Sequence, residues 1–513
     1  MLVITLLSLL IAVPLSSSKI SPVQLTRATS VTFFFAAALS FNAYYVTTLG
    51  SGVSLYSGLF HVSTVSMAIE CFIFVVGGLI LLPWASSAYT ANLTGESVRP
   101  TIAEYPMIVV FTTIGASFLV SSTDLVSLYL AIELQSFAVY ILAALYRNNE
   151  SATAAGLKYF LLGALSSALI LLGSSLIYGY TGLTNLDAIS SLVSVSSPSD
   201  TVTQGVVLGL VIMTVGFLFK IASAPFHNWA PDVYDGVPTI VTTWLAVMPK
   251  ISIFVLLLTL NSLTDGLGLT LGDVTVNVWQ ALLLVCSLFS LIIGTVVGLA
   301  QFRIKRLLAY STISHVGFML LAIAVSGQES IDAFLFYLIQ YSITSLNGFL
   351  ILLAFGYLMF AKSNQNNSDV QFISQLAGQF RQNPILALSM IICLFSMAGI
   401  PPLMGFFAKY AVLYTAIHNG YYFISLVGIL TSVVSAAYYL RVVRVLYFDN
   451  PTNTAEVQES SLFVSGAHEK GQVITSTHSY LIAVLTAIIV LFVLQPSLIL
   501  NSTQLMAMSI YGY

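Results

Sequence analysis

Residues 215–254 read VGFLFKIASAPFHNWAPDVYDGVPTIVTTWLAVMPKISIF, the most informative stretch of the sequence. Lys220 and Lys250 each lie in an apolar run long enough to cross a bilayer, and a segment rich in Pro, Gly and Asp separates the two runs. An ammonium group inside hydrocarbon costs several kcal/mol, so it usually marks an ion path or a paired counter-charge. These two lysines are therefore the starting point for both fold and function.

The composition is that of a membrane protein. Of the 513 residues, 58% are hydrophobic and only 7% are charged, and the mean hydropathy is +0.96. In soluble domains, about a quarter of the residues are charged. Apolar runs of about 20 residues recur from end to end, as in polytopic helical membrane proteins. The net charge of −3 carries no information on partners, and nothing in the sequence indicates nucleic-acid binding.

We predict an all-α polytopic fold with about fourteen membrane-spanning helices. The first apolar run is interpreted as a helix and not as a cleaved signal peptide, because no positive charge precedes it. The predicted spans are 2–16, 29–48, 62–84, 106–121, 124–146, 155–180, 204–224, 239–261, 277–300, 306–326, 331–361, 384–418, 421–447 and 479–499.

The distribution of basic residues supports this count. The chain has 16 Lys and Arg, and all but four lie in loops that follow odd-numbered spans or at the ends of such spans. Loops after even-numbered spans carry only acids. By the positive-inside rule, both termini face the side opposite to the basic loops. The four exceptions are the intramembrane lysines Lys158, Lys220, Lys250 and Lys409.

Two carboxylates lie within predicted spans. Glu133 lies midway along residues 124–146, and an intramembrane carboxylate is functional by default, with a purely structural pair as the alternative. Glu70 lies in residues 62–84 without comparable polar neighbours, so there we favour packing or contact with a partner.

The four lysines differ in depth. Lys158 lies about a turn inside its span and can extend to the basic surface. Lys220 precedes Pro225, where a broken helix exposes backbone carbonyls. Lys250 follows Pro249 near mid-span, too deep to reach either surface. Burial favours a neutral lysine and a nearby carboxylate favours the charged form, so a buried lysine between these effects can load and release a proton.

Histidines and a polar helix add candidates. His315 lies with Ser311 and Ser314 in a predicted span, and His227 lies in the break after Lys220. Histidine changes charge near neutral pH, so proton relay and a structural hydrogen bond are equally open for each. The span after His315 carries polar residues that suit a file of water: Gln340, Ser342, Thr344, Ser345 and Asn347.

Lys409 follows a second helix break, which contains Gly399, Pro401, Pro402 and Gly405. The breaks fall in the seventh and twelfth predicted spans, an odd offset, so the two lie in opposite orientation and indicate an inverted repeat. We predict one membrane domain, 1–513, with four parts: an N-terminal three-helix segment (1–105), a first repeat of spans 4–8 (106–261), a second repeat of spans 9–13 (277–447), and a basic-side loop with the last helix (448–513).

Ionisable groups at similar depth, joined by water, form a proton wire. The predicted row consists of Glu133, Lys158, Lys220, Lys250, His315 and Lys409. The three cysteines match no metal spacing, and no nucleotide loop or nucleophile–base motif occurs, so redox chemistry is expected elsewhere.

Several segments resemble the antiporter-like membrane subunits of respiratory complex I, in the branch of mitochondrial chain 2 and bacterial subunit N. They are LYLAIELQSFAVYILAALYR, GLKYFLLGALSSALILLGSSLIYG, FKIASAPFHNWAPDVYDGVPT, KRLLAYSTISHVGF and SMAGIPPLMGFFAKY. The resemblance covers nearly the whole chain and looks closest to fungal or plant mitochondrial versions.

The resemblance implies roles for individual residues. Glu133 is similar to the family's span-five glutamate and Lys220 to its lysine partner. Lys158 is similar to the span-six lysine, Lys250 to the central lysine, and Lys409 to the lysine facing the exit half-channel. In the family, quinone reduction in a distant domain drives charge shifts that separate and re-form the glutamate–lysine pair.

The resemblance also implies the setting. No cofactor is expected in this chain, whereas NADH, FMN, iron–sulfur clusters and ubiquinone are expected in other subunits. The expected partners are a neighbouring antiporter-like subunit, small membrane subunits, accessory subunits and phospholipids. The expected location is the mitochondrial inner membrane, with both termini on the intermembrane-space side.

Two other functions remain open. A subunit of a multi-subunit cation/proton antiporter shares the fold and the Glu–Lys pair. A structural membrane scaffold with inert buried charges is the third possibility. Redox subunits that accompany the purified protein, and neutral substitutions at Glu133 or Lys220, would discriminate among them.

Overall fold

The structure is a computed structural model. It describes residues 1–15, 22–45, 52–94, 102–147, 149–197, 200–261, 268–271, 274–363, 369–449 and 474–510.

The described chain is mostly helical, as predicted. The longer helices are α1 (Leu2–Leu15), α2 (Pro22–Tyr44), α3 (Thr64–Thr94), α4 (Tyr105–Ser121), α5 (Leu125–Ala144), α6 (Glu150–Thr181), α8 (Thr201–Lys220), α10 (Thr239–Asn261), α11 (Val278–Leu299), α12 (Ile304–Val325), α13 (Gln328–Ser363), α15 (Pro384–Ala398), α16 (Met404–His418), α17 (Tyr422–Tyr447), α18 (Ser476–Leu491) and α19 (Ser497–Ile510). The short elements are α7 (Leu186–Val195), α9 (Trp229–Gly236), α14 (Gln379–Gln382), the 3-10 turns η3 (Ile373–Leu376) and η4 (Phe492–Leu494), and two antiparallel hairpins, β1 (Val53–Leu55) with β2 (Phe60–Val62) and β3 (Gly268–Leu271) with β4 (Val274–Asn277).

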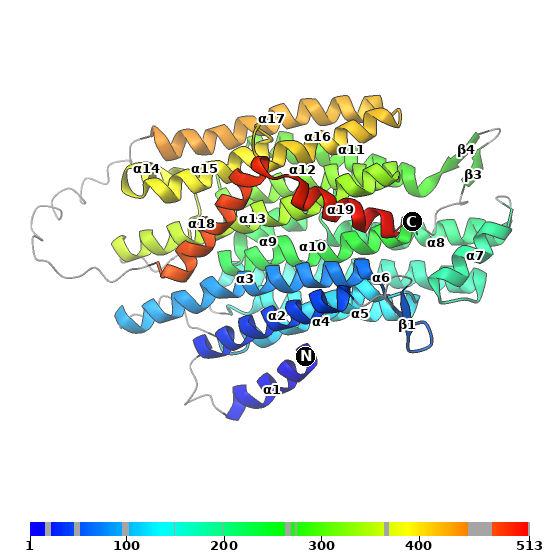
Figure 1. Cartoon of the computed structure of the whole chain (residues 1–513), viewed down its shortest axis with the longest axis horizontal. Helices are drawn as coiled ribbons and strands as arrows, with labels where there is room; N and C mark the ends of the chain where they lie inside the picture. The colour runs from blue at the N-terminus through cyan, green and yellow to red at the C-terminus, as the bar shows by residue number, and fades with distance from the viewer. Residues whose placement is uncertain are drawn as a thin grey trace, which may run out of the picture.

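Most helices run along the long axis of the molecule (Figure 1). The blue helices α1 to α3 form one edge, the yellow and orange helices α15 to α17 form the opposite edge, and α10, α12 and α13 lie between them. Ten described helices are long and apolar enough to cross a membrane. The apolar window of α10 is completely buried, so the helix that carries Lys250 is the central one.

The two ends of the bundle are closed by different contacts. At one end, hairpin β1–β2 contacts the segment before α5 through the isolated bridge Phe60–Ser122, and the bridge Asp124–Asn185 joins the starts of α5 and α7. At the other end, the segment after residue 369 crosses the start of α12 through the bridge Arg303–Phe372. Leu376 of this segment is fully buried. The apolar side chains of the segment therefore anchor it to the bundle.

Both predicted helix breaks are present. α8 ends at Lys220 and α9 begins at Trp229, whereas α15 ends at Ala398 and α16 begins at Met404. The first break contains the cis bond Ala224–Pro225 and the second contains the cis bond Pro401–Pro402. Trp229 donates its ring N–H to the carbonyl of Phe219, 2.9 Å away, which satisfies one acceptor near the end of α8.

Two features differ from the sequence prediction. The last predicted span, 479–499, is wrong at its end, because α18 stops at Leu491 and a further helix, α19, follows. Pro496 lies between them, and proline lacks the N–H that a continuous helix needs there. The loop between the sixth and seventh predicted spans contains α7, whose buried Leu186, Ile189 and Val193 follow a helical spacing.

Candidate functional site: a buried row of lysines

Glu133 and Lys220 form a buried ion pair. The lysine Nζ lies 3.6 Å from Oε1 of Glu133, and only 6% of the lysine side chain and 11% of the glutamate side chain are exposed. The ammonium also donates to Ser136 Oγ on α5 at 2.7 Å and to Ser167 Oγ on α6 at 3.0 Å. Lys220 therefore lies where α5, α6 and the end of α8 meet. It hydrogen-bonds one serine of α5 and one serine of α6, and it pairs with the carboxylate of Glu133.

Glycines allow α6 and α8 to approach closely enough for these bonds. A Cβ added at Gly173 would lie 2.5 Å from the carbonyl oxygen of Gly209, and one at Gly209 would lie 2.8 Å from that of Gly173. One turn from Lys220, a Cβ at Gly216 would lie 2.8 Å from the carbonyl oxygen of Ser166. Small residues are the usual means of close packing between membrane helices.

Pro249 shapes the surroundings of Lys250. Proline has no N–H, so the carbonyl of Leu245, four residues earlier, loses its helical donor. The hydroxyl of Tyr234, from α9, replaces that donor at 3.4 Å. The same hydroxyl accepts a hydrogen bond from Lys250 Nζ at 3.0 Å. The kink thus brings a tyrosine against the ammonium.

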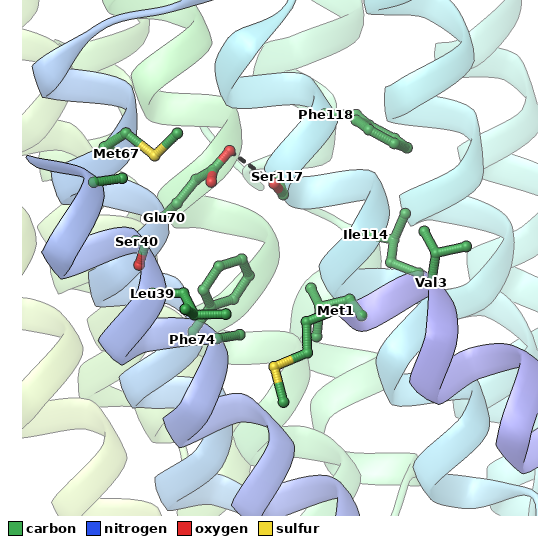
Figure 2. Close-up of a pocket in the computed structure, with 13 residues that line it drawn as sticks. Met1, Val3, Leu39, Ser40, Met67, Glu70, Phe74, Ile114, Ser117 and Phe118 are labelled. Atoms are coloured by element: carbon green, nitrogen blue, oxygen red, sulfur yellow. Dashed lines mark hydrogen bonds between the residues drawn. The ribbon is translucent and has the colours of Figure 1, made fainter. Parts of the chain in front are cut away.

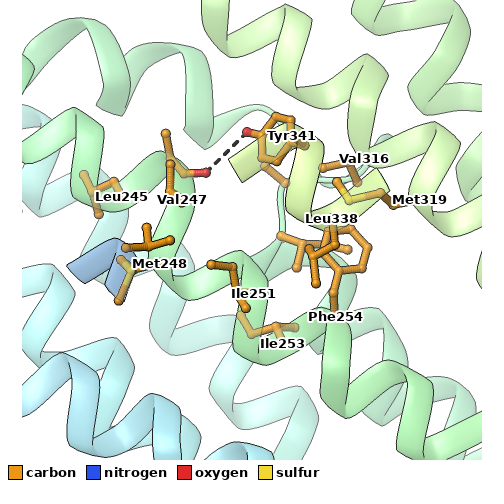
Figure 3. Close-up of a cluster of buried hydrophobic side chains, with 14 of the residues drawn as sticks. Leu245, Val247, Met248, Ile251, Ile253, Phe254, Val316, Met319, Leu338 and Tyr341 are labelled. Atoms are coloured by element: carbon orange, nitrogen blue, oxygen red, sulfur yellow. Dashed lines mark hydrogen bonds between the residues drawn. The ribbon is translucent and has the colours of Figure 1, made fainter. Parts of the chain in front are cut away.

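A second tyrosine closes the other side of Lys250. The hydroxyl of Tyr341, from α13, lies 3.4 Å from the ammonium and within hydrogen-bond distance of two acceptors, the carbonyl of Ala246 at 3.3 Å and Thr312 Oγ1 on α12 at 3.1 Å. Figure 3 shows its hydroxyl turned toward the α10 backbone above a layer of apolar side chains that includes Phe254. Among the described residues, no carboxylate lies within ion-pair distance of Lys250.

His315 on α12 is held by two further tyrosines. Its Nδ1 lies 2.7 Å from the hydroxyl of Tyr337 and its Nε2 lies 3.4 Å from that of Tyr439. The hydroxyl of Tyr439 also bonds Ser311. The ring of His315 lies 5.6 Å from the ring of Tyr341, which connects this group to the surroundings of Lys250.

Lys409 on α16 reaches back into the second break. Its Nζ donates to the carbonyl of Ala398, the last residue of α15, at 2.9 Å, and lies 5.6 Å from the ring of Phe318. Gly399 ends α15 with φ +87°, and a Cβ there would lie 3.0 Å from the lysine chain. Glycine therefore permits both the backbone turn and the path of the lysine.

Five of the six residues of the predicted row are buried, and contacts link them into two groups: Glu133 with Lys220, and Lys250 with His315 and Lys409. The rings of Phe318 and Tyr337 stack with centroids 5.9 Å apart, so Lys409 and His315 share this aromatic pair. Gln135 on α5, the residue before Ser136, and Ser252 on α10, two residues after Lys250, exchange hydrogen bonds of 3.0 and 3.1 Å. No hydrogen bond between described residues joins Lys220 to Lys250 directly.

Lys158 lies outside this row. Its side chain is 41% exposed and pairs with Asp232 of α9. The sequence allowed this outcome, because Lys158 lies near the end of its span. Asp232 and Asp235 also bind arginines from α12, so Lys158 belongs to an ion-pair network at the basic end of the bundle.

The other predicted polar residues differ in their partners. His227 lies in the first break, and among the described residues its Nδ1 has no hydrogen-bond partner. The polar residues of α13 bond mainly within their own helix: Gln340 bonds Thr344, and Ser342 and Ser345 bond backbone carbonyls one turn earlier. The prediction of a water file along α13 stays a prediction.

Glu70 lies apart from the row, on α3. It accepts a hydrogen bond of 2.8 Å from Ser117 of α4. Figure 2 shows the carboxylate beside a cavity of about 320 Å³, lined mainly by apolar side chains of α1 to α4.

Sequence reasoning missed the tyrosines and serines that contact the lysines and His315. These are Ser136, Ser167, Tyr234, Tyr337, Tyr341 and Tyr439. Tyr337 and Tyr341 are four residues apart and so share a helix face. That signal alone is weak, because the chain has 26 tyrosines. Among the described residues, no group of three or more His, Cys, Asp or Glu is arranged to hold a metal ion.

Comparison with known protein families identifies the class of membrane protein to which the chain belongs. The family model described as NADH:quinone oxidoreductase/Mrp antiporter, transmembrane, matches residues 122–435, a range that contains all six predicted site residues. The chain belongs to this family, which confirms the resemblance noted in the sequence.

Within the family, the relatives point to one branch. NADH-ubiquinone oxidoreductase chain 2 of Rhizopus oryzae is 47% identical over 535 residues, which cover 100% of both chains. NADH-quinone oxidoreductase subunit N of Rhodospirillum rubrum is 38% identical over 403 residues, covering 78% of this chain and 76% of the relative. This chain is a member of the chain 2 and subunit N branch.

A solved structure agrees. A chain in the structure titled respiratory complex I from Thermus thermophilus with bound Aureothin superposes with a TM-score of 0.72 at 27% identity, covering 98% of this chain and 99% of that one.

Proposed function

We propose that this chain is a proton-translocating core subunit of the membrane arm of NADH:ubiquinone oxidoreductase. Its contribution to the enzyme is proton movement, whereas NADH, FMN, iron–sulfur clusters and ubiquinone bind to other subunits. The observation that carries the proposal is the buried Glu133–Lys220 ion pair, the first member of the predicted row. The relatives of this chain are named as subunits of NADH-ubiquinone oxidoreductase. The oxidoreductase names of the relatives favour this function over the antiporter alternative.

The proposed mechanism starts at the ion pair. A charge that develops nearby weakens the interaction between Glu133 and Lys220, so the lysine loses the carboxylate that favours its charged form. Its proton then moves toward Lys250, whose partners are neutral hydroxyls, and onward past His315 to Lys409. Re-forming the pair reloads Lys220. Groups this close titrate as coupled units, so a change at one end alters proton occupancy along the row.

Neutral substitutions test this mechanism. In the assembled complex, we expect Glu133→Gln and Lys220→Met each to slow proton transfer through this subunit by about a hundredfold or more, as loss of a positioned proton donor does. NADH oxidation and proton translocation are measured together in sealed vesicles, and assembly is checked on native gels. Asp449→Asn is the control, because its pair with Arg444 is exposed and 3.9 Å long. Full pumping by a normally assembled Lys220→Met complex would contradict the proposal and favour the scaffold.

Co-purification separates the two transporter classes. Purified in mild detergent, the chain is expected to bring along subunits that carry flavin and iron–sulfur centres, detected by absorbance and electron paramagnetic resonance. Isolation with cation-antiporter subunits alone would favour the antiporter.

The finer architecture belongs to the same proposal. We infer about fourteen crossings, with α8–α9 and α15–α16 each counted as one broken crossing, and α18–α19 as the last. The first inverted repeat is assigned to 106–261 and the second to 277–447, after an N-terminal segment (1–105) and before the last part (448–513). The equivalent breaks beside Lys220 and Lys409 support this division.

The location and partners follow from the relatives. We infer a multi-pass protein of the mitochondrial inner membrane, with both termini on the intermembrane-space side. Its partners are the neighbouring antiporter-like subunit and small membrane subunits of the complex, with accessory subunits and phospholipids around them.

A further inference from the structure

Helix α9 presents two kinds of side chain on two faces. Asp232 and Asp235 are three residues apart and share one face, whereas Tyr234 projects from another. The carboxylates point to the basic end of the bundle, where cations from α6 and α12 meet them. The tyrosine hydroxyl reaches Lys250 at 3.0 Å.

Three cations hold the two carboxylates. Asp232 binds Lys158 of α6 and also Arg306 Nη2 of α12 at 2.6 Å. Oδ2 of Asp235 lies 2.6 Å from Arg303 Nη1 and 3.3 Å from Arg306 Nε. We call these five residues the charge clamp.

The clamp joins parts of the chain that are distant in sequence. Lys158 comes from α6, which is separated from α9 by two helices, and the two arginines come from the start of α12, beyond α10 and α11. Only 7% of the Asp235 side chain is exposed, and this buried carboxylate accepts a hydrogen bond from Arg303 and forms an ion pair with Arg306. Charge-assisted hydrogen bonds of this kind are shorter and stronger than neutral ones.

Helix α9 needs such support. At 8 residues it is far below the length at which a helix is stable alone. Trp229, stacked on Tyr159 with centroids 4.4 Å apart, anchors its start. The clamp anchors the rest, including the turn that carries Tyr234.

We propose that the charge clamp positions the Tyr234 hydroxyl between Lys250 and the carbonyl of Leu245. Asp235 and Arg303 are thus positioning residues for proton relay, acting on Lys250 only through α9 and Tyr234. This inference rests on the proposed relay function of Lys250. It explains why the acids of the first break bind arginines of the second half of the chain.

The test is a double-mutant cycle in the assembled complex. We expect Tyr234→Phe and Asp235→Asn each to slow NADH-driven proton translocation about two- to tenfold, the effect of one hydrogen bond. Because both act through the same hydroxyl, the double variant should match Tyr234→Phe within about twofold. Effects that multiply, or a Tyr234→Phe complex that translocates normally, would overturn the inference.

Variants of Arg303 provide a second test of the charge clamp. They disturb folding less, because 46% of the Arg303 side chain is exposed. It makes one bond to Asp235, which a lysine ammonium can replace. Arg303→Lys should therefore translocate normally, whereas Arg303→Gln should be slowed like Asp235→Asn. Equal rates for the two Arg303 variants would overturn the clamp, and Asp449→Asn controls for loss of an exposed pair.

Lys250→Met separates this inference from the proposed function. If Lys250→Met translocates normally, the relay itself is wrong and the clamp inference falls with it. If Lys250→Met is inactive while the cycle shows independent effects, the relay stands and only the positioning role is contradicted.

Discussion

Among single residues, the three lysines of the row differ in whether a charged partner is present. Among the described residues, Lys220 has a carboxylate and two hydroxyls, whereas Lys250 has two tyrosine hydroxyls and Lys409 has a backbone carbonyl. The charged form is thus better stabilised at Lys220 than at Lys250 or Lys409. In the proposed relay, a proton that leaves Lys220 enters sites that hold it less firmly and so release it more easily.

The ion pair makes a prediction about assembly. Removing one partner of a buried pair leaves an uncompensated charge and costs about 3–5 kcal/mol, whereas removing both is often nearly neutral. We therefore expect the Glu133→Gln/Lys220→Met double variant to assemble better, and to denature at higher temperature, than Lys220→Met or Glu133→Gln alone. Native gels and thermal denaturation measure this. A double variant less stable than both single variants would contradict the pair as the dominant contact of these residues.

Among the secondary-structure elements, irregular backbone occurs next to the lysines of the row, where backbone carbonyls accept hydrogen bonds from side chains. The breaks after α8 and α15 and the kink at Pro249 each leave carbonyls without helical donors, and Trp229, Lys409 and Tyr234 bind such carbonyls. Within a bilayer, unwound backbone is tolerated only where protein groups or water satisfy it.

Pro249→Ala tests the kink. Alanine supplies an N–H for the Leu245 carbonyl, so the helix should be at least as stable, but Tyr234 then loses its acceptor beside Lys250. We expect normal assembly with proton translocation slowed about two- to tenfold. Pro384→Ala is the matched control, because Pro384 begins α15, where a helix has no use for the N–H. Unchanged translocation in Pro249→Ala would show that the kink does not serve the relay.

Gly209→Leu tests the close approach of α6 and α8. A side chain there would meet Ile177 at 2.7 Å and the Gly173 carbonyl at 2.8 Å, so we expect overpacking to cost about 1–3 kcal/mol and lower the yield of complex. Gly179→Leu on α6 should be neutral, since nothing lies within 4 Å of an added Cβ. Equal yields for the two variants would contradict the role of Gly209 in packing.

Much of this arrangement was predictable from the sequence, and the limits have physical causes. Buried charges and helix breaks are costly in a membrane, so Glu133, Lys220, Lys250 and both breaks stand out as exceptions in apolar runs. Lys158 could not be assigned, because a lysine one turn inside a helix can point to either environment. The tyrosines were missed because a tyrosine fits both apolar packing and hydrogen bonding.

At the scale of the whole molecule, the charge distribution indicates how the chain lies in the membrane. The charge clamp and the buried pair Lys305–Asp369, at 3.0 Å, gather at the end that also contains the bridge Arg303–Phe372. Hairpin β1–β2 and α7 lie at the opposite end. The positive-inside rule predicts the orientation of the chain from this asymmetry.

Labelling of introduced cysteines tests the proposed sidedness. Tyr56, at the exposed turn of β1–β2, and Glu150, at the exposed start of α6, lie at opposite ends. In mitoplasts, an impermeant maleimide should modify Tyr56→Cys but not Glu150→Cys, and inverted vesicles should give the reverse. The unmodified chain, with Cys286 and Cys393 buried, gives the background. Modification of both positions from one side would contradict the predicted topology.

The hydroxyl contacts around Lys250 and His315 have a consequence for energy conversion. A tyrosine hydroxyl can donate and accept a hydrogen bond, and rotation about its C–O bond turns it from one partner to another. In the proposed relay, Tyr234, Tyr341, Tyr337 and Tyr439 can therefore pass a proton in either direction. In its proposed role, the subunit takes its direction from the driving reaction alone. A sufficiently large proton-motive force should therefore drive protons through the subunit in the reverse direction and drive reverse electron transfer in the complex.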